Sequence, residues 1–132
     1  MTVTEYLNAV KERLVTDPWV LEFRVVRERI TVSDGYLRAR LVLADGSFLE
    51  FSEYVQCSPD GTIEVITYSY HWADVEGRLI RRWDNTPHFP HLAGFPHHIH
   101  IGSAGAVVPG RPVNIFEILD EIAQRFLGAD ID

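Results

Sequence analysis

The stretch YLRARLVLADG (36–46) has the pattern of a strand that ends in a tight turn. Apolar side chains occupy every second position, and this spacing puts them on one face of an extended chain. They are Leu37, Ala39, Leu41 and Leu43. The positions between them carry Tyr36, Arg38 and Arg40, which therefore point to the opposite face. The stretch predicts a strand with a core side and an outer side.

Similar runs, rich in Val, Ile, Tyr and Phe, continue on both sides of this strand from Trp19 to Trp83. The turn signals that separate these runs are SDG (33–35), ADG (44–46), SPDG (58–61) and DVEG (74–77). Consecutive strands that are joined by short turns pair in an antiparallel manner. We therefore expect an antiparallel meander sheet of about five strands.

Each end of the chain predicts a helix. Thr2 and Glu5 form a capping-box pattern, and Asn114 and Glu117 repeat it near the C-terminus. The apolar stripe of the first helix is Val3, Leu7, Val10 and Leu14. The stripe of the second helix, which ends before Gly128, is Ile115, Ile118, Leu119, Ile122, Ala123 and Phe126. The fold class is therefore α+β, a single domain over 1–132 with both helices packed on one face of the sheet.

The composition is that of an ordinary soluble globular protein, with 46% apolar and 23% charged residues in a chain of 132. The single cysteine, Cys57, has no partner for an internal disulfide. Because we find no long apolar run and no signal-peptide pattern, we expect a cytoplasmic protein without membrane contact. The net charge of −7 argues against general nucleic-acid binding. Residues 71–112, however, hold 4 basic and 3 acidic residues and all six histidines, which leaves room for a local anion site.

Residues 85–112 contain five of the seven prolines and four of the nine glycines. We expect a long, mostly irregular functional loop with at most a short strand around 97–101. If that segment is extended, His98 and His100 share one face and His97 points the other way. Two imidazoles on one face suit either acid–base chemistry near neutral pH or metal binding.

Metal binding would require more than the two histidines. A zinc-type ion needs a third ligand, for which the nearby candidates are His88, His91, Asp84 and Glu53. The spacing of these residues matches no zinc signature. We therefore expect no cofactor, and the alternative is a site for zinc or another divalent metal formed by His88, His98 and His100.

The runs YSYHW (68–72) and RLIRRWDN (78–85) flank the turn DVEG and should pair as a hairpin. This pairing brings the arginines of the second run near His71 and the tyrosines. Alternation also places three aromatic side chains together on one face, Tyr68, Tyr70 and Trp72. We interpret these aromatics as core residues, and the alternative is a stacking platform for single-stranded RNA.

Histidines, arginines and tyrosines together provide what the cleavage of an RNA phosphodiester through its 2′-hydroxyl requires. A base removes the hydroxyl proton, cations stabilise the charge that grows on the phosphate, and an acid protonates the leaving oxygen. This chemistry requires no metal. The motifs GxSxG, GxxxxGK and GxGxxG are absent, which excludes serine-hydrolase, nucleotidase and dinucleotide-binding functions.

The segment YSYHWADVEGRLIRRWDNTPHFPHLAGFPHHIHIG (68–102) resembles the TumE family, the toxins of prokaryotic type II toxin–antitoxin pairs. The resemblance implies a growth inhibitor that is neutralised by a helix-turn-helix antitoxin, and RNA cleavage is the commonest activity of such small toxins. The matching polar residues are Glu53, Tyr70, His71, Arg82, Asp84, Asn85, His88, His98 and His100. In this chain Phe89 stands where the family often has a second histidine, and Ile99 where it often has a basic residue. Both departures lower the positive charge that is available to RNA.

Our leading hypothesis is a metal-independent endoribonuclease toxin in which His98 and His100 form the acid–base pair. Arg81 or Arg82 would hold the phosphate, and Asp84 or Glu53 would orient an imidazole. The catalytic candidates are thus His98, His100, His71, Asp84 and Arg82, and the substrate-binding candidates are Tyr70, Arg81, Asn85, His88 and Glu53. One alternative is a metal-binding protein or hydrolase of the zinc type, and another is a non-enzymatic protein-interaction module.

Overall fold

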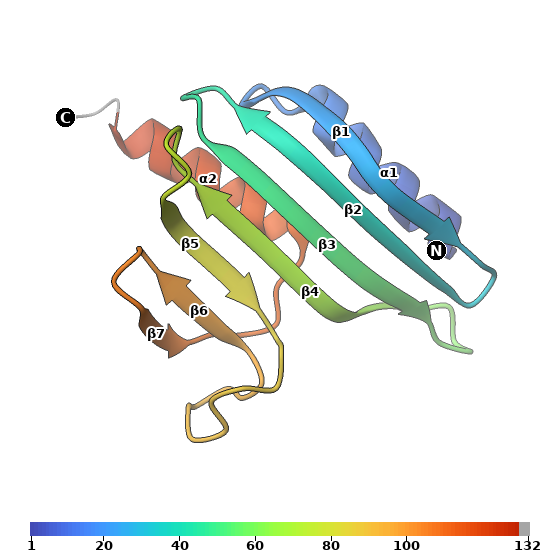
Figure 1. Ribbon diagram of the computed structural model, residues 1–132. Helices are drawn as coiled ribbons and strands as arrows, with labels where there is room; N and C mark the ends of the chain where they lie inside the picture. The colour runs from blue at the N-terminus through green and yellow to red at the C-terminus, as the bar shows by residue number, and fades with distance from the viewer. Residues whose placement is uncertain (130–132) are drawn as a thin grey trace.

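The computed structural model describes residues 1–129, which form two helices and seven strands (Figure 1). Helix α1 spans Val3–Thr16 and helix α2 spans Ile115–Ala129. The strands between them are β1 (Val20–Ile30), β2 (Asp34–Leu43), β3 (Phe48–Cys57), β4 (Ile63–Ala73), β5 (Leu79–Asp84), β6 (His98–Ile101) and β7 (Ala106–Pro109).

All seven strands form one sheet, in which every neighbouring pair is antiparallel and the spatial order equals the order in the chain. This confirms the predicted antiparallel meander. The prediction of about five strands is wrong, because β6 and β7 extend the sheet beyond β5. Strand β6 is the short strand that we expected around 97–101, whereas β7 lies in a part of 85–112 that we expected to be irregular.

The additional strands result from a hairpin that the proline-rich surroundings obscure. Gly102 and Gly105 have positive φ angles of 65° and 80° in the turn between β6 and β7, a conformation that glycine adopts without strain. The sequence GSAG between HIHI and AVVP is therefore a turn signal between two short strands. Pro109 is tolerated because β7 is an edge strand, where its missing N–H is not needed by a neighbour.

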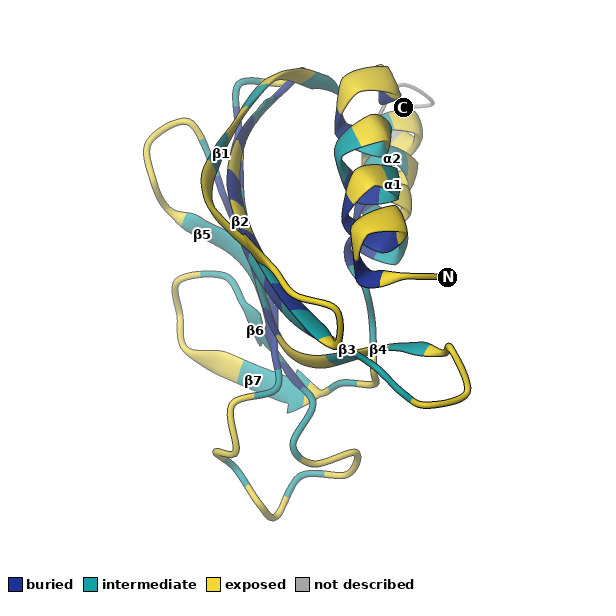
Figure 2. Cartoon of the chain, turned by 90° about the vertical axis from the view of Figure 1, so that its right-hand side faces the viewer, coloured by how far each residue is buried: buried dark blue, intermediate teal, exposed yellow. Residues whose placement is uncertain are grey.

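Both helices cover the same face of the sheet, as Figure 2 shows, and this confirms their predicted position. The core lies between the helices and that face. It includes the alternating residues of β2 that the sequence predicted, Leu37, Ala39, Leu41 and Leu43. Tyr68, Tyr70 and Trp72 are also buried there. Their interpretation as core residues is confirmed, and a stacking platform for RNA on these rings is excluded.

The opposite side of the sheet carries mostly polar side chains, and no helix among residues 1–129 covers it (Figure 2). We call it the open face. In the register of the strands, one row of residues crosses it from β1 to β6, Arg24, Arg40, Glu50, His71, Arg82 and His100. The open face is therefore the surface on which polar chemistry is accessible.

The helices begin where the sequence predicts. The backbone N–H of Glu5 donates to Thr2 Oγ1 at 3.0 Å, and that of Thr2 donates to Glu5 Oε1 at 2.9 Å. Helix α2 is capped by Asn114, but it continues past Gly128, where we expected it to end. Within the described part of the chain, neither helix combines the length and the apolar composition that crossing a membrane requires.

A buried carboxylate joins the sheet to both helices. Glu53 on β3 is 1% exposed and accepts hydrogen bonds from the hydroxyls of Tyr6 in α1, at 2.7 Å, and Tyr70 in β4, at 2.6 Å. It also accepts from the backbone N–H of Ile115, the first residue of α2, at 2.8 Å. Burial raises the pKa of Glu53, although the three donors act in the opposite direction. Glu53 and Tyr70 therefore have a structural role, because the hydrogen bonds of Glu53 connect α1, β3, β4 and α2.

Candidate functional site

Strand pairing brings the polar residues of β4, β5 and β6 together on the open face. Arg82 on β5 lies opposite His71 of β4 and His100 of β6. Two residues further along β5, Asp84 lies opposite His98 of β6. Because directly opposed residues of a sheet point to the same face, these side chains form one continuous cluster.

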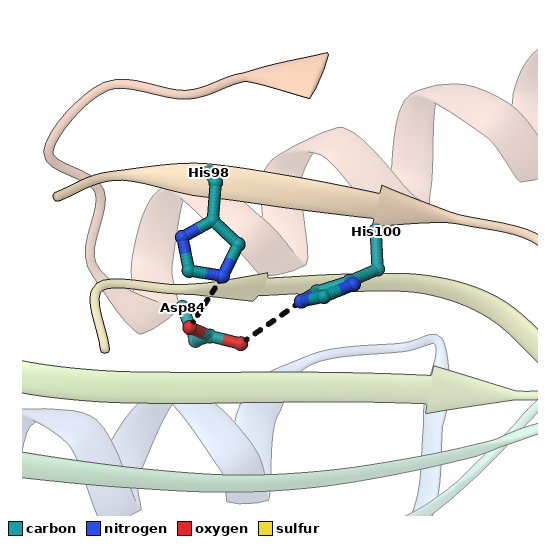
Figure 3. A group of neighbouring side chains, drawn as sticks. All are labelled: Asp84, His98 and His100. Atoms are coloured by element: carbon teal, nitrogen blue, oxygen red, sulfur yellow. Dashed lines mark ion pairs between the residues drawn. The ribbon is translucent and has the colours of Figure 1, made fainter. Parts of the chain in front are cut away.

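Asp84 is the centre of this cluster (Figure 3). Its Oδ1 lies 2.9 Å from His98 Nε2 and accepts a hydrogen bond from the Thr86 N–H at 3.1 Å. Its Oδ2 accepts a hydrogen bond from Arg82 Nε at 3.0 Å and lies 3.6 Å from His100 Nε2. The side chain is buried, so its charge is stabilised by these partners rather than by water. Asp84 is placed to orient an arginine and two imidazoles.

His98 is fixed in position on both sides of its ring. It is 2% exposed, and its Nδ1 lies 2.9 Å from the carbonyl oxygen of Pro96. Its Nε2, on the other side of the ring, lies 2.9 Å from Asp84 Oδ1, and both contacts are within hydrogen-bond distance. Both ring nitrogens are therefore occupied. His98 holds Asp84 in place, which differs from the expectation that it exchanges protons with a substrate as the partner of His100.

His100 is the more accessible of the two histidines on β6, with 28% of its side chain exposed. Its 3.6 Å separation from Asp84 is longer than a hydrogen bond, so its ring proton is not committed to the carboxylate. Burial lowers the pKa of His100, and the nearby Asp84 charge partly offsets that effect. This imidazole is available to a bound molecule.

His71 lies on the other side of Arg82. The guanidinium Nη1 of Arg82 is 3.5 Å from His71 Nδ1, and burial together with the Arg82 charge lowers the pKa of His71. The two residues line a hollow of about 400 Å³ on the open face. The other lining residues are Arg38, Glu50, Phe51, Ser52 and Ser69. A group bound in this hollow would lie beside both an imidazole and a guanidinium.

Phe89 covers the opposite end of the cluster. Its ring centroid is 5.1 Å from that of His98 and 6.0 Å from that of His100. Among residues 1–129 it is the one non-glycine residue with a positive φ, 58°, a left-handed conformation that is strained for a bulky side chain. The loop thus accepts strain where it places an aromatic ring over the two imidazoles.

Several predicted site residues lie elsewhere. Glu53 and Tyr70 are in the core on the helix side of the sheet. Arg81 also points to that side, where it lies 3.6 Å from Glu121 of α2 and over the ring of Trp83. These residues are separated from Asp84 by the sheet itself, because adjacent residues of a strand point to opposite faces. We therefore leave all three out of the site.

Two further predicted residues, Asn85 and His88, lie next to the cluster in sequence but outside its network of contacts. Asn85 uses its side chain to continue the sheet, since its Oδ1 accepts from the Tyr68 N–H at 3.0 Å and its Nδ2 donates to the Ile66 carbonyl at 2.9 Å. His88 is exposed in the loop beside Phe89, with ring centroids 6.2 Å apart. His97 points to the helix side, as alternation predicts, where the Tyr68 hydroxyl lies 2.8 Å from its Nδ1.

The hollow beside His71 is also lined by four polar residues that are not among the predicted site residues, Arg38, Glu50, Ser52 and Ser69. Their signal is present in the sequence, because the alternation that places Leu37 and Leu41 in the core also places Arg38 on the outer face. Alternation within one strand does not predict the register between strands, and this register brings Arg38 close to His71.

A metal ion would find three possible ligands here. One ligand atom each from Asp84, His98 and His100 lies within 4.8 Å of the other two. His88, which the metal alternative included, does not belong to this group. The donor set suits a divalent ion. In this arrangement, however, Asp84 already has Arg82 and His98 as close partners, and a metal would have to displace the 2.9 Å contact with His98 and tolerate the guanidinium.

The comparison with models of known protein families gives a match. The sequence model of the family described as "Toxin TumE" matches residues 10–126, which include every strand, half of α1 and most of α2. The search of curated proteins and the search of solved structures give no match.

Proposed function

Because this chain belongs to the TumE toxin family, we propose that it is a toxin that stops growth by cleaving RNA with its own side chains and without a metal. Membership in a toxin family implies an antitoxin partner, and we propose a helix-turn-helix protein for that role. The observation that supports RNA cleavage is the row His71–Arg82–His100 on three adjacent strands. It places a guanidinium between two imidazoles on an accessible face.

The spacing of this row suits an in-line displacement at phosphorus. Neighbouring strands lie about 4.8 Å apart, so His71 and His100 are separated by about 10 Å at their backbones, with Arg82 between them. A phosphate that binds Arg82 would have one imidazole on each side. That is where the attacking 2′-hydroxyl and the leaving 5′-oxygen of an RNA phosphodiester must lie.

We assign His71 as the base and His100 as the acid. The guanidinium beside His71 opposes protonation of its imidazole, whereas the Asp84 carboxylate beside His100 favours it. His71 takes the proton of the 2′-hydroxyl as the 2′-oxygen bonds to phosphorus. The bond from phosphorus to the 5′-oxygen breaks, and that oxygen takes the proton of His100. The products are a 2′,3′-cyclic phosphate and a 5′-hydroxyl.

Asp84 and His98 act as positioning residues in this scheme. Asp84 holds the Arg82 guanidinium at 3.0 Å from its Oδ2 and stabilises the protonated form of His100. His98 and the Thr86 N–H in turn hold the other oxygen of Asp84. Phe89 limits the water around His100, which strengthens the electrostatic interactions there.

Expression from a tightly repressed promoter tests the toxin proposal. We expect the wild-type chain to stop growth and fragment cellular RNA, and the His71→Ala/His100→Ala variant to permit growth with intact RNA, because it lacks both proton-transfer groups. A matched control is His91→Ala, which removes an exposed histidine of the loop outside the cluster and should stay toxic.

Equal toxicity of the wild type and the double variant, at equal protein levels, would contradict the acid–base scheme. Normal growth and intact RNA with the wild type, together with a stable complex between the histidine loop and the protein encoded next to it, would instead support the non-enzymatic interaction module. A helix-turn-helix protein encoded beside the gene is expected under the toxin proposal.

A metal-binding function is the second candidate, and the 4.8 Å grouping of Asp84, His98 and His100 is the observation that favours it. Elemental analysis of protein purified without a histidine tag decides between the two. We expect no stoichiometric zinc or other transition metal, and we expect RNA cleavage to persist in excess EDTA. One bound metal per chain, lost in His98→Ala and retained in His91→Ala, would establish the metal centre instead.

A further inference from the structure

The open face carries a concentration of arginine that the acidic chain as a whole does not suggest. The strand register places six of the twelve lysines and arginines there, Arg24, Arg27, Arg29, Arg38, Arg40 and Arg82. The acidic residues that the same register places on this face are Glu22, Asp34, Glu50, Glu64 and Asp84. Cations therefore outnumber anions on this face, although the net charge of the chain is −7.

Two cross-strand pairs on this face combine like charges. Arg24 of β1 lies directly opposite Arg40 of β2, and Arg27 lies opposite Arg38. Like charges that face each other across strands destabilise a sheet, so this arrangement costs folding free energy. Two adjacent pairs of this kind create a site where a bound polyanion would replace repulsion by attraction.

The ion pairs on the face leave part of this positive charge available. Glu50 is shared by Arg38 and Arg40, with Arg40 Nη2 at 2.6 Å from its Oε1. Arg24 and Arg27 form no ion pair with any of the described residues 1–129. Arg27 instead lies over the ring of Tyr36, 6.0 Å from its centroid. The Glu50 carboxylate thus forms ion pairs with two arginines, whereas the charges of Arg24 and Arg27 are not neutralised by an ion pair in the described part of the chain.

These arginines are continuous with the proposed catalytic row. Arg40 lies opposite Glu50, Glu50 opposite His71, and His71 opposite Arg82. At about 4.8 Å per strand, Arg24 and Arg82 are about 19 Å apart across the sheet, a span that several phosphates of one strand can occupy. The hollow of about 400 Å³ beside His71 lies between the two ends of this path.

We propose that the open face of β1, β2 and β3 binds the single-stranded RNA that flanks the cleaved bond. Arg24, Arg27, Arg38 and Arg40 contact its phosphates, and the rings of Tyr36 and Tyr54 on the same face offer stacking surfaces for its bases. The nature of the bound polymer rests on the proposed function, because an RNA-cleaving row at one end of the arginines favours RNA over an acidic protein.

Binding is measured without cleavage, in the His71→Ala/His100→Ala background. Fluorescence anisotropy with a labelled, unstructured RNA of about 15 nucleotides gives the affinity at several salt concentrations. Adding Arg24→Ala and Arg27→Ala is expected to weaken binding at least tenfold at low salt. It should also reduce the slope of log affinity against log salt by about 1.4, since each lost phosphate contact accounts for about 0.7 on a single strand.

The matched control adds Arg78→Ala and Arg111→Ala to the same background. It makes the same change in net charge at two exposed arginines, one in the β4–β5 turn and one before α2. We expect its affinity and salt slope to equal those of the background. Equal losses in both variants would mean that only net charge matters and would overturn the proposal.

Failure of this inference and failure of the cleavage proposal give different results. If the protein with intact histidines does not cleave RNA, but Arg24 and Arg27 still determine RNA binding, the binding face stands and the cleavage proposal falls. If it cleaves RNA and the Arg24→Ala/Arg27→Ala variant cleaves and binds equally well, the binding face falls. Unchanged RNA binding with loss of antitoxin binding would also overturn it, because the face would then bind a protein.

Discussion

Purified His71→Ala and His100→Ala variants are each expected to cleave RNA with kcat/KM lower by about 10²–10⁴-fold, the usual contribution of one general base or acid. Each histidine provides a proton-transfer group that no neighbour replaces in the proposed scheme. His98 does not substitute for His100, because it is 2% exposed and both of its ring nitrogens have close partners. The measurement is steady-state cleavage of a short labelled RNA.

The pH dependence separates the roles of the two histidines. Activity rises with pH as the base loses its proton and falls as the acid loses its own, so kcat/KM follows a bell. Burial lowers the pKa of both imidazoles, and we therefore expect the maximum below their ordinary value of 6.5. His71→Ala should remove the acidic limb of the bell, and His100→Ala should remove the alkaline limb.

The pH profile of the Asp84→Asn variant distinguishes an electrostatic role of Asp84 from a purely structural one. The carboxylate favours the protonated form of His100, so its removal lowers the pKa of His100 further and shifts the alkaline limb to lower pH. His91→Ala should leave both limbs in place. If each single histidine variant retains the full bell and wild-type kcat/KM, the row His71–Arg82–His100 is not the catalytic site.

The largest expected effect on stability is that of Glu53→Ala, which should lower the free energy of unfolding by about 3–5 kcal/mol. The substitution leaves the hydroxyls of Tyr6 and Tyr70 and the N–H of Ile115 without their shared acceptor in the core. Each buried donor without a partner costs about 1–3 kcal/mol, and a cavity adds to that cost. Urea denaturation followed by circular dichroism measures the change.

Glu12→Ala, at an exposed position of α1, is the matched control and should change stability by less than about 0.5 kcal/mol. A loss of similar size in both variants would contradict the structural role of Glu53.

The Glu53→Gln variant tests whether the charge of Glu53 matters for stability. Burial raises the pKa of Glu53 above 4.5, so the folded state binds more protons than the unfolded state in the range just above that value. The stability that Glu53 contributes should therefore decrease as pH rises through this range, and the Glu53→Gln variant should lack this dependence because its amide does not titrate.

Much of the fold follows from local patterns. The capping boxes at Thr2 and Asn114 locate the two helices, and four turn signals define β1 to β5. The short strand around 97–101 is β6, but β7 was not predicted because the prolines and glycines of 85–112 obscure a short hairpin signal. Short strands are stabilised by pairing with an existing edge, here that of β5, and such pairing is not visible in local sequence.

The prediction of the site was partial for a related reason. Alternation separated His98 and His100 from His97, and the hairpin brought His71 near the arginines. Alternation within β5 also distinguishes Arg82 from Arg81, but only the position of the helices decides which of the two faces is covered. Glu53 was a candidate for orienting an imidazole because the family resemblance includes it, and nothing in the sequence shows that its partners lie in the core.

The sequence by itself determined the α+β class, the meander of β1 to β5, and most of the residues that share a face within these strands, because these depend on periodicities of two and 3.6 residues along the chain. The tertiary structure decided which strand residues meet across the sheet and how deeply each is buried. That is why His98 became a buried partner of Asp84, and His71 and His100 became neighbours of Arg82. Register and burial arise from packing between segments distant in sequence, and no local pattern contains them.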